Sequence, residues 1–433
     1  MEKEQRQKLI ALLKREVVPA IGCTEPMAVA LCAARAAEKL GTRPESIEVL
    51  LSANILKNAM GVGIPGTGMV GLPIAVALGA LIGKSAYGLE VLRDNTPEAT
   101  AEAKAYMESH TIGIALKSDA PDNLYIEVHV HAGGREASAV IAYAHTRFID
   151  EEQSPAGAAP DSCEAQPDAS DTDDDRWLSL RLVYEFATTA PIEEINFINE
   201  ARRLNLHAAE EALKGNYGHN LGKTLSRPLG RGILGESIFS HMLSVTSAAC
   251  DARMAGAMIP VMSNSGSGNQ GIAATLPVVI YARDNHNTDE ELTRALVMSH
   301  LTAIYIKQSL GRLSALCGCV VACTGSSCGI TYLMGGNFQQ MAYAVKNMIA
   351  NLAGMVCDGA KPSCALKLCS GVSTASLSAM LAIQNRFVTA AEGLIEDDVD
   401  RCIRNLTRIG HDGMKETDRL VLDIMTHKGT CPH

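Results

Sequence analysis

The spacing of apolar residues predicts two helices at the start of the chain. Apolar side chains within 4–18 recur on one helical face, and Pro19 ends the pattern. A second helical pattern runs from Thr24, the expected N-cap, to Gly41. A mostly apolar stretch at 69–83 predicts a buried helix further on.

A different period follows, and it predicts a small sheet. Residues 124–130 alternate between apolar and polar side chains, as a half-buried strand does. Segments 112–116 and 136–144 have the same character, and Gly133-Gly134 is suited to a hairpin turn between two of the strands. With a further strand expected at 46–54, these segments predict a small antiparallel sheet.

After Trp177 the pattern is almost entirely helical. The expected helices lie at 178–189, 192–213, 236–256, 289–308, 337–356, 372–384 and 396–409. Aromatic residues make up only 4% of the chain, so small aliphatic side chains must fill the core, which favours closely packed helices. The fold class is therefore α+β, with a predominantly helical C-terminal portion and a small antiparallel sheet in the N-terminal portion.

The net charge of −10 has a single source. Ten of the 48 acidic residues and none of the 38 basic residues fall within 150–175, where large apolar side chains are almost absent. Such composition predicts a disordered linker at 150–176 between a mixed α/β portion at 1–149 and a helical portion at 177–433. The remaining charges balance, which gives no electrostatic reason to expect nucleic acid or a membrane as a partner.

Targeting signals and cysteine usage both point to a reducing compartment. The charged N-terminus lacks the apolar run of a signal peptide, and the 69–83 stretch is shorter than the roughly 20 residues that span a bilayer. We therefore expect a cytoplasmic protein. In such a protein, thirteen cysteines are reduced thiols that serve in metal binding, catalysis or packing.

Seven of the cysteines cluster between residues 317 and 369. No two cysteines in the chain have the C-x2-C spacing of zinc ribbons, ferredoxin-type runs and thioredoxin-like pairs. A metal site would therefore draw its thiolates from separate helix ends, with Cys357 expected to close one helix and Cys364 to begin the next. The alternative is that these thiols are small buried apolar groups.

Three further segments could carry chemistry. Cys23 lies just before a predicted helix, where free amides and the helix dipole favour a thiolate, so it is either a nucleophile or base, or a structural thiol. The glycine-rich segment 263–271, ahead of a helix expected near Ile272, could surround a carboxylate with amides or form an ordinary turn. Asn58 precedes a second glycine-rich loop at 60–68, which could contact a substrate or only allow close packing.

Three motifs together resemble a known family. They are Gly-Cys-Thr-Glu-Pro at 22–26, Ser-Asn-Ser-Gly-Ser-Gly-Asn-Gln-Gly at 263–271 and Cys-Asp-Gly-Ala-Lys-x-x-Cys-Ala at 357–365. The chain resembles the L-cysteine desulfidase family, which is related to the catalytic chain of iron–sulfur L-serine dehydratases. The resemblance covers nearly the whole chain except residues 150–176.

The resemblance implies a 4Fe-4S cluster held by three cysteines, with one iron open to a small amino-acid substrate. The implied ligands are Cys317, Cys357 and Cys364, and Cys23 is implied to be the active-site thiol, as a base or as a resting ligand of the open iron. The implied reaction is α,β-elimination of L-cysteine to hydrogen sulfide, ammonia and pyruvate. The residues expected to contact the substrate are Thr24, Glu25, Asn58, Ser265, Gly266, Ser267, Gly268 and Asn269.

The sequence leaves several alternatives open. Extra thiols at Cys319, Cys323 and Cys328 leave the identity of the first ligand uncertain. An iron–sulfur L-serine dehydratase is the nearest rival, although a Ser-Ser-His-Thr signature associated with those enzymes is absent. A non-catalytic metal- or thiol-sensing protein and a helical partner-binding protein are rivals from other classes. The oligomeric state is also open, with a homodimer as one candidate assembly.

Overall fold

The computed structural model describes residues 1–149, 177–311 and 313–428, and the predicted linker at 150–176 lies outside them. The described residues form two compact units. One, the helical unit, contains residues 1–22 and 177–421, and the other, the sheet unit, contains residues 23–149 and 422–428. The helical C-terminal portion and the small sheet confirm the predicted α+β class.

The sheet unit is built on four strands. Their order across the sheet is β3 (Thr111–Leu116), β2 (Ser46–Leu51), β4 (Tyr125–Ala132) and β5 (Arg135–Ala142). The apolar residues of 124–130 are buried as their alternation predicts. Gly133 and Gly134 form the hairpin turn with φ of +56° and +74°, values that glycine adopts without strain.

The sheet differs from the sequence prediction in two details. β2 pairs antiparallel with β4 and parallel with β3, so one of the three pairings is parallel. The strand expected to reach residue 54 ends at Leu51, because helix α3 (Ala53–Ala59) begins two residues later. Asn58 therefore lies on a helix.

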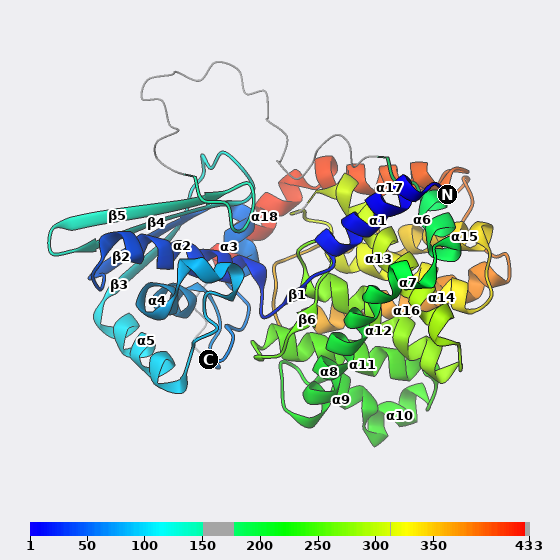
Figure 1. Cartoon of the computed structure of the whole chain (residues 1–433), viewed down its shortest axis with the longest axis horizontal. Coiled ribbons are helices and arrows are strands. Elements are labelled where there is room, and N and C mark those ends of the chain that lie inside the picture. The colour runs from blue at the N-terminus through cyan, green and yellow to red at the C-terminus, as the bar shows by residue number, and fades with distance from the viewer. Residues whose placement is uncertain (150–176, 312, 429–433) are drawn as a thin grey trace, which may run out of the picture. The chain divides into compact units, whose positions relative to one another are not determined.

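Helices cover one face of this sheet (Figure 1). They are α2 (Thr24–Leu40), α4 (Leu72–Ile82), the short 3₁₀ helix η1 (Ser85–Glu90) and α5 (Pro97–Ser109). α2 packs on β4 and β5, and α4 packs on α2. A Cβ at Gly79 of α4 would lie 2.3 Å from the carbonyl oxygen of Ala30, so a glycine is required for this close approach.

The helical unit contains most of the remaining elements. They are α1 (Lys3–Glu16), α6 (Leu180–Thr189), α7 (Ile192–Ile195), η4 (Asn196–Ile198), α8 (Asn199–Lys214), α9 (Leu221–Ser226), α10 (Pro228–Leu234), α11 (Ile238–Met254), α12 (Gly268–Asp284), α13 (Asp289–Leu310), α14 (Gly318–Leu333), α15 (Phe338–Leu352), α16 (Cys364–Ile383), α17 (Val399–Arg408) and the π turn η5 (Ile409–Gly413). A last helix, α18 (Lys415–Thr426), ends the described chain.

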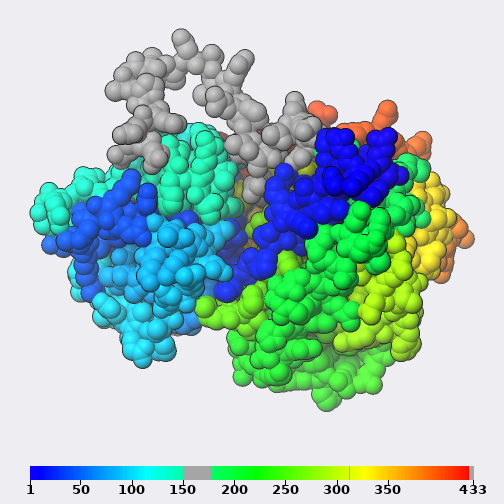
Figure 2. Space-filling model, viewed as in Figure 1, coloured from blue at the N-terminus to red at the C-terminus, as the bar shows by residue number. Residues whose placement is uncertain are grey.

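Residues 1–22 at the start of the chain belong to the helical unit, although the residues that follow them belong to the sheet unit. α1, dark blue in Figure 2, lies on the surface of this unit, and Arg6 forms an ion pair with Glu194 at 3.0 Å. The short strand β1 (Pro19–Ala20) pairs antiparallel with β6 (Val261–Met262). The sequence prediction grouped residues 1–22 with the rest of the N-terminal portion at 1–149.

The centre of the helical unit is α14, which contacts α12, α13, α15 and α16. Its residues from Cys319 to Thr331 are all buried, and most of them are Gly, Ser, Thr or Cys. A Cβ at Gly325 would lie 2.2 Å from the carbonyl oxygen of Ser299 on α13. The buried hydroxyls donate to carbonyls one turn earlier in the same helix, as Thr324 does to Val320 at 2.8 Å.

Several helix boundaries correct the sequence prediction. α14 was not expected, because a helix buried on all sides has no apolar stripe to reveal its period. α9, α10 and α18 were not expected either, and α12 begins at Gly268, four residues before the expected start. α15 ends at Leu352, so Cys357 does not close a helix, whereas Cys364 begins α16 as predicted.

α16 is long and apolar enough to cross a membrane by length and composition. Core helices of soluble proteins pass the same test, and half of the most apolar part of α16 is buried within the protein.

Candidate functional site

The structure brings the three predicted ligand cysteines into one region of the helical unit. Cys317 is the N-cap of α14, and Cys357 lies in the segment between α15 and α16. These two segments are joined as a short antiparallel bridge. The amide of Cys317 donates to the carbonyl oxygen of Met355 at 2.9 Å, and the amide of Cys357 donates to the carbonyl oxygen of Ala315 at 2.6 Å.

Cys364 joins this region from the first turn of α16. The three thiols are close enough for their charges to interact, since Cys357 raises the pKa of both Cys317 and Cys364. Cys317 and Cys364 stand at the N-terminal ends of long helices, where the helix dipole favours negative charge. The bridge thus determines the positions of Cys317 and Cys357, and the start of α16 determines the position of Cys364.

Burial is the main influence on two of these thiols. It raises the pKa of Cys317, which is 8% exposed, and of Cys364. The positive charge of Lys367 on α16 lowers both pKa values in part. A thiol bound to a metal is deprotonated outright, so a bound iron-containing group would stabilise the thiolate form that burial disfavours.

The extra thiols have other partners. The Sγ of Cys319 donates to the carbonyl oxygen of Lys367 at 3.1 Å and lies 3.7 Å from the Sγ of Cys323. Cys323 and Cys328 are fully buried in α14. Of the three, Cys319 is the one nearest the region of Cys317, and its charge raises the pKa of Cys317.

The glycine-rich segment forms a tight turn that leads into α12. Ser265 and Gly266 have φ of +48° and +78°, and they are flanked by Asn264 and Ser267, whose backbones exchange two hydrogen bonds of 3.0 Å. Two positive φ values in succession are typical of a type I′ turn. The side chain of Asn264 donates to Nδ1 of buried His300 at 3.0 Å, which fixes the turn to α13.

The side chains of this segment form local hydrogen bonds that the sequence did not predict. Ser267 is the N-cap of α12, and its Oγ accepts from the amide of Gln270. Asn269, expected in a loop, lies in the first turn of α12 and accepts a hydrogen bond from the thiol of Cys250 at 3.5 Å. The negative charge of Cys364 raises the pKa of Cys250 further, after burial, so Cys250 lies between this turn and the cysteine region.

Two residues that the sequence reasoning missed connect these parts. The guanidinium of Arg253, which is 4% exposed, packs against Gly268, because a Cβ there would lie 2.2 Å from its Nε. The amide group of Gln270 packs against Gly318, beside Cys317, at 3.0 Å from the position of a Cβ. The Oε1 of Gln270 is buried without a hydrogen-bond partner among the described residues. Nothing in the sequence singled out Arg253, because the same segment also contains the polar residues His241 and Asp251.

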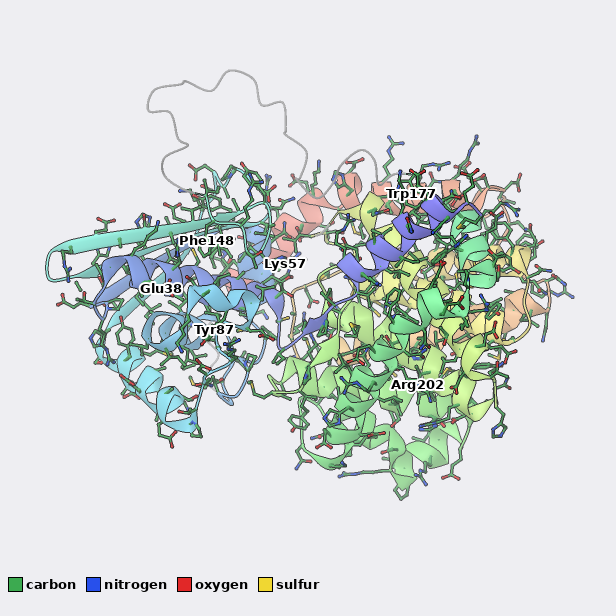
Figure 3. The ribbon with its side chains drawn as sticks, viewed as in Figure 1. Glu38, Lys57, Tyr87, Phe148, Trp177 and Arg202 are labelled. Carbon is green, nitrogen blue, oxygen red and sulfur yellow. The ribbon has the colours of Figure 1, made fainter. Side chains whose placement is uncertain are left out.

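The remaining predicted residues belong to the sheet unit. Cys23 is the N-cap of α2 and 3% exposed, so Thr24 is the first helical residue and not the cap expected from the sequence. The structure brings Glu25 and Asn58 together, as Nδ2 of Asn58 donates to Oε1 of Glu25 at 3.4 Å. Lys57, labelled in Figure 3, precedes Asn58 on α3 and is 1% exposed.

The donor set of the cysteine region is suited to an iron–sulfur cluster. Thiolates are the usual ligands of such clusters, and three thiols lie in this region, at two helix starts and in a bridged segment. Among the described residues, no group of three or more His, Cys, Asp or Glu side chains is already placed to hold a metal ion.

Comparisons with known proteins identify relatives along the whole chain. The family model of the serine dehydratase alpha chain matches residues 86–423. A UPF0597 protein of Bacteroides thetaiotaomicron is 65% identical over 434 residues, covering 100% of both chains. UPF0597 proteins of Porphyromonas gingivalis and Aeromonas hydrophila are 54% and 46% identical, over 99% and 98% of this chain and 100% and 97% of their own.

Proposed function

The chain belongs to the serine dehydratase alpha chain family, and on this premise we propose that it is an iron–sulfur lyase that releases hydrogen sulfide from L-cysteine. Members of this family are generally iron–sulfur-dependent lyases. The L-cysteine substrate and the 4Fe-4S type of the cluster go beyond what family membership implies, and they are our proposal. The products would be hydrogen sulfide, ammonia and pyruvate.

We assign Cys317, Cys357 and Cys364 as the cluster ligands. When bound, a cluster with one iron free of protein thiolates supplies a Lewis acid that helps the β-substituent of the substrate to leave. The geometry favours Cys317 over Cys319, because Cys317 is bridged to the segment of Cys357 while Cys319 faces Cys323 and a carbonyl.

The chain's own residues bind the substrate and move its proton in this proposal. The turn at 263–271, with Ser265, Ser267 and Asn269, holds the carboxylate, and Arg253 beside Gly268 adds a buried positive charge there. The thiolate of Cys23 takes the α-proton, the electron pair of the Cα–H bond forms the Cα–Cβ double bond, and the Cβ–S bond breaks with sulfide as the leaving group. The resulting aminoacrylate reacts with water to give pyruvate and ammonia.

A single observation carries the proposal. Two backbone hydrogen bonds join the segments of Cys317 and Cys357, next to the helix start that holds Cys364. Thiols that served only as apolar packing would have no need of a backbone bridge between two of them or of two helix N-termini.

L-serine is a second candidate substrate, because the matching family model is named for serine dehydratase. The two substrates differ in the leaving group, sulfide or hydroxide, while the carboxylate, the ammonium and the α-proton are shared. The absent Ser-Ser-His-Thr signature is our reason for placing L-cysteine first.

The test uses protein purified without oxygen and reconstituted with iron and sulfide. We expect about four irons per chain and the formation of pyruvate from L-cysteine. If L-serine also reacts, we expect a kcat/KM for L-cysteine at least tenfold above that for L-serine, which corresponds to roughly 1.4 kcal/mol in transition-state free energy. Alanine at Cys357 or Cys364 should remove most of the iron. Full iron content in both variants would contradict the ligand assignment, and a preference for L-serine would reverse the choice of substrate.

We also propose that the protein acts in the cytoplasm as a homodimer, without nucleic acid or a membrane as a partner. Gel filtration with light scattering gives the mass, and cell fractionation gives the location.

A further inference from the structure

Lys367 lies in the cysteine region, although none of the three motifs that suggested the site contains it. It occupies the first turn of α16, three residues after Cys364. We propose that Lys367 is a positioning residue that fixes the segment of Cys357 to α16 and places a positive charge beside that ligand. The proposal rests on the ligand assignment given above.

The geometry shows the fixing role. The Nζ of Lys367 donates to the carbonyl oxygen of Val356 at 2.7 Å and forms an ion pair with the carboxylate of Asp358. These two acceptors flank Cys357. One ammonium group therefore holds both sides of a ligand residue that otherwise lies in a segment without helix or strand.

The backbone of the same residue makes a further connection. The carbonyl oxygen of Lys367 accepts a hydrogen bond from the thiol of Cys319 on α14. Lys367 thus links α16, the segment of Cys357 and the start of α14, which are the three elements that carry the ligands. Loss of its side chain should release the segment of Cys357 first.

The positive charge of Lys367 lies beside Cys357, because its ammonium bonds to the residues on both sides of that cysteine. The same side chain belongs to the turn of α16 that begins at Cys364. The side chain is 24% exposed, so solvent screens this charge less than that of a surface lysine. Net charge close to an iron–sulfur cluster shifts its reduction potential, and a nearby cation favours the more negative, reduced state.

A neighbouring lysine makes only local contacts and shows what is particular to Lys367. The Nζ of Lys361 donates to the carbonyl oxygen of Asp358 at 2.7 Å and pairs with its carboxylate at 2.5 Å. These contacts stay within the segment between Cys357 and Cys364. Lys361 therefore shapes that segment, whereas Lys367 attaches it to a helix.

The first experiment needs no cluster. Hydrogen exchange is measured on the apoprotein for peptides that contain the amides of Cys317 and Cys357, which form the bridge. We expect Lys367→Met to speed exchange there by about tenfold or more, because the opening free energy of a locally held segment falls when its anchor is removed. Lys367→Arg should stay close to wild type, since a guanidinium can reach two acceptors.

A matched control separates this effect from general destabilisation. Lys346 is 4% exposed, and its Nζ donates to the carbonyl oxygen of Asp397 at 2.8 Å, outside the cysteine region. Lys346→Met removes a buried lysine with a similar bond and should leave the exchange of the bridge unchanged. Unchanged exchange in Lys367→Met, or an equal rise in Lys346→Met, would overturn the proposal.

The second experiment uses the reconstituted protein. We expect Lys367→Met to bind less iron than wild type and to give a more negative reduction potential, with both values restored in Lys367→Arg. A potential in Lys367→Met equal to that of wild type would refute the charge role. If wild type binds no iron, the proposed function fails, while the exchange result still decides whether Lys367 positions the segment.

Discussion

Gly371 on α16 offers a direct test of how the packing of α14 and α16 supports the site. A Cβ at this position would lie 2.6 Å from the Sγ of Cys319 and 2.7 Å from the Sγ of Cys323. Both sulfurs are buried, and the thiol of Cys319 is held by its bond to the carbonyl of Lys367. Gly371→Ala should therefore push apart the two helices that begin at Cys317 and Cys364.

The magnitude follows from two opposing effects. Overpacking a rigid core costs about 1–3 kcal/mol, and two sulfur contacts below 3 Å place this case near the upper limit. Replacing a glycine inside a helix by alanine returns about 1 kcal/mol. We expect a net loss of about 2 kcal/mol in the free energy of unfolding, or a fall in Tm of roughly 4–8 °C for a unit of this size.

The assay compares the same substitution in two backgrounds. Urea unfolding under reducing conditions gives the effect of Gly371→Ala in wild type and in a variant carrying Cys319→Ala and Cys323→Ala. With both sulfurs removed, the added methyl group has room, and the substitution should become neutral or stabilising by up to about 1 kcal/mol. An equal cost in both backgrounds would show that the sulfurs do not limit the packing. The amount of iron bound after reconstitution should fall when Gly371→Ala is made in the wild-type background.

Three further predictions follow from other parts of the chain. Cys23→Ser should keep the iron content of wild type while turnover falls by about two orders of magnitude, the scale of a lost general base, and turnover within threefold of wild type would make the thiol structural. Burial lowers the pKa of His300 to about 3, below its value in the unfolded chain, so the free energy of unfolding should fall as the pH drops from about 6.5 towards 3. Urea titrations at several pH values should show a weaker pH dependence in His300→Asn. Gly232→Ala on α10, where the structure leaves space for a Cβ, should raise Tm, whereas Gly325→Ala on α14 should lower it; the opposite order would refute the packing assignment.

The parts of the fold that the sequence predicted are those with a simple period. The alternation at 124–130 gave a strand, and Gly133-Gly134 gave its turn, because one face of the sheet is buried and the other is not. α14 has no such asymmetry. Its glycines, serines and cysteines are buried on every side, and its local preference for helix is weak, so only the surrounding helices establish it. The parallel pairing of β2 with β3 likewise depends on contacts distant in sequence.

The site shows the same division between local and distant information. The third motif contains Cys357 and Cys364, whereas only the family resemblance implied Cys317. Gln270 could have been included, since it lies within the 263–271 motif, but nothing in the sequence indicated its packing against Gly318. The role of Lys367 depends on acceptors at Val356 and Asp358 that only the folded chain brings within reach.

The strand pairing of β1 with β6 has a consequence for how the protein is made on the ribosome. Residues 19–20 emerge early, but their partners at 261–262 follow about 240 residues later, after all four strands of the sheet unit have been synthesised. These four strands can therefore form their sheet before β1 and β6 can pair. A gene fragment that starts at residue 177 would produce a helical unit without β1, with the edge at Val261 and Met262 open to other chains. Dissection of this protein should instead remove residues 23–176 as an insertion and rejoin residue 22 to residue 177.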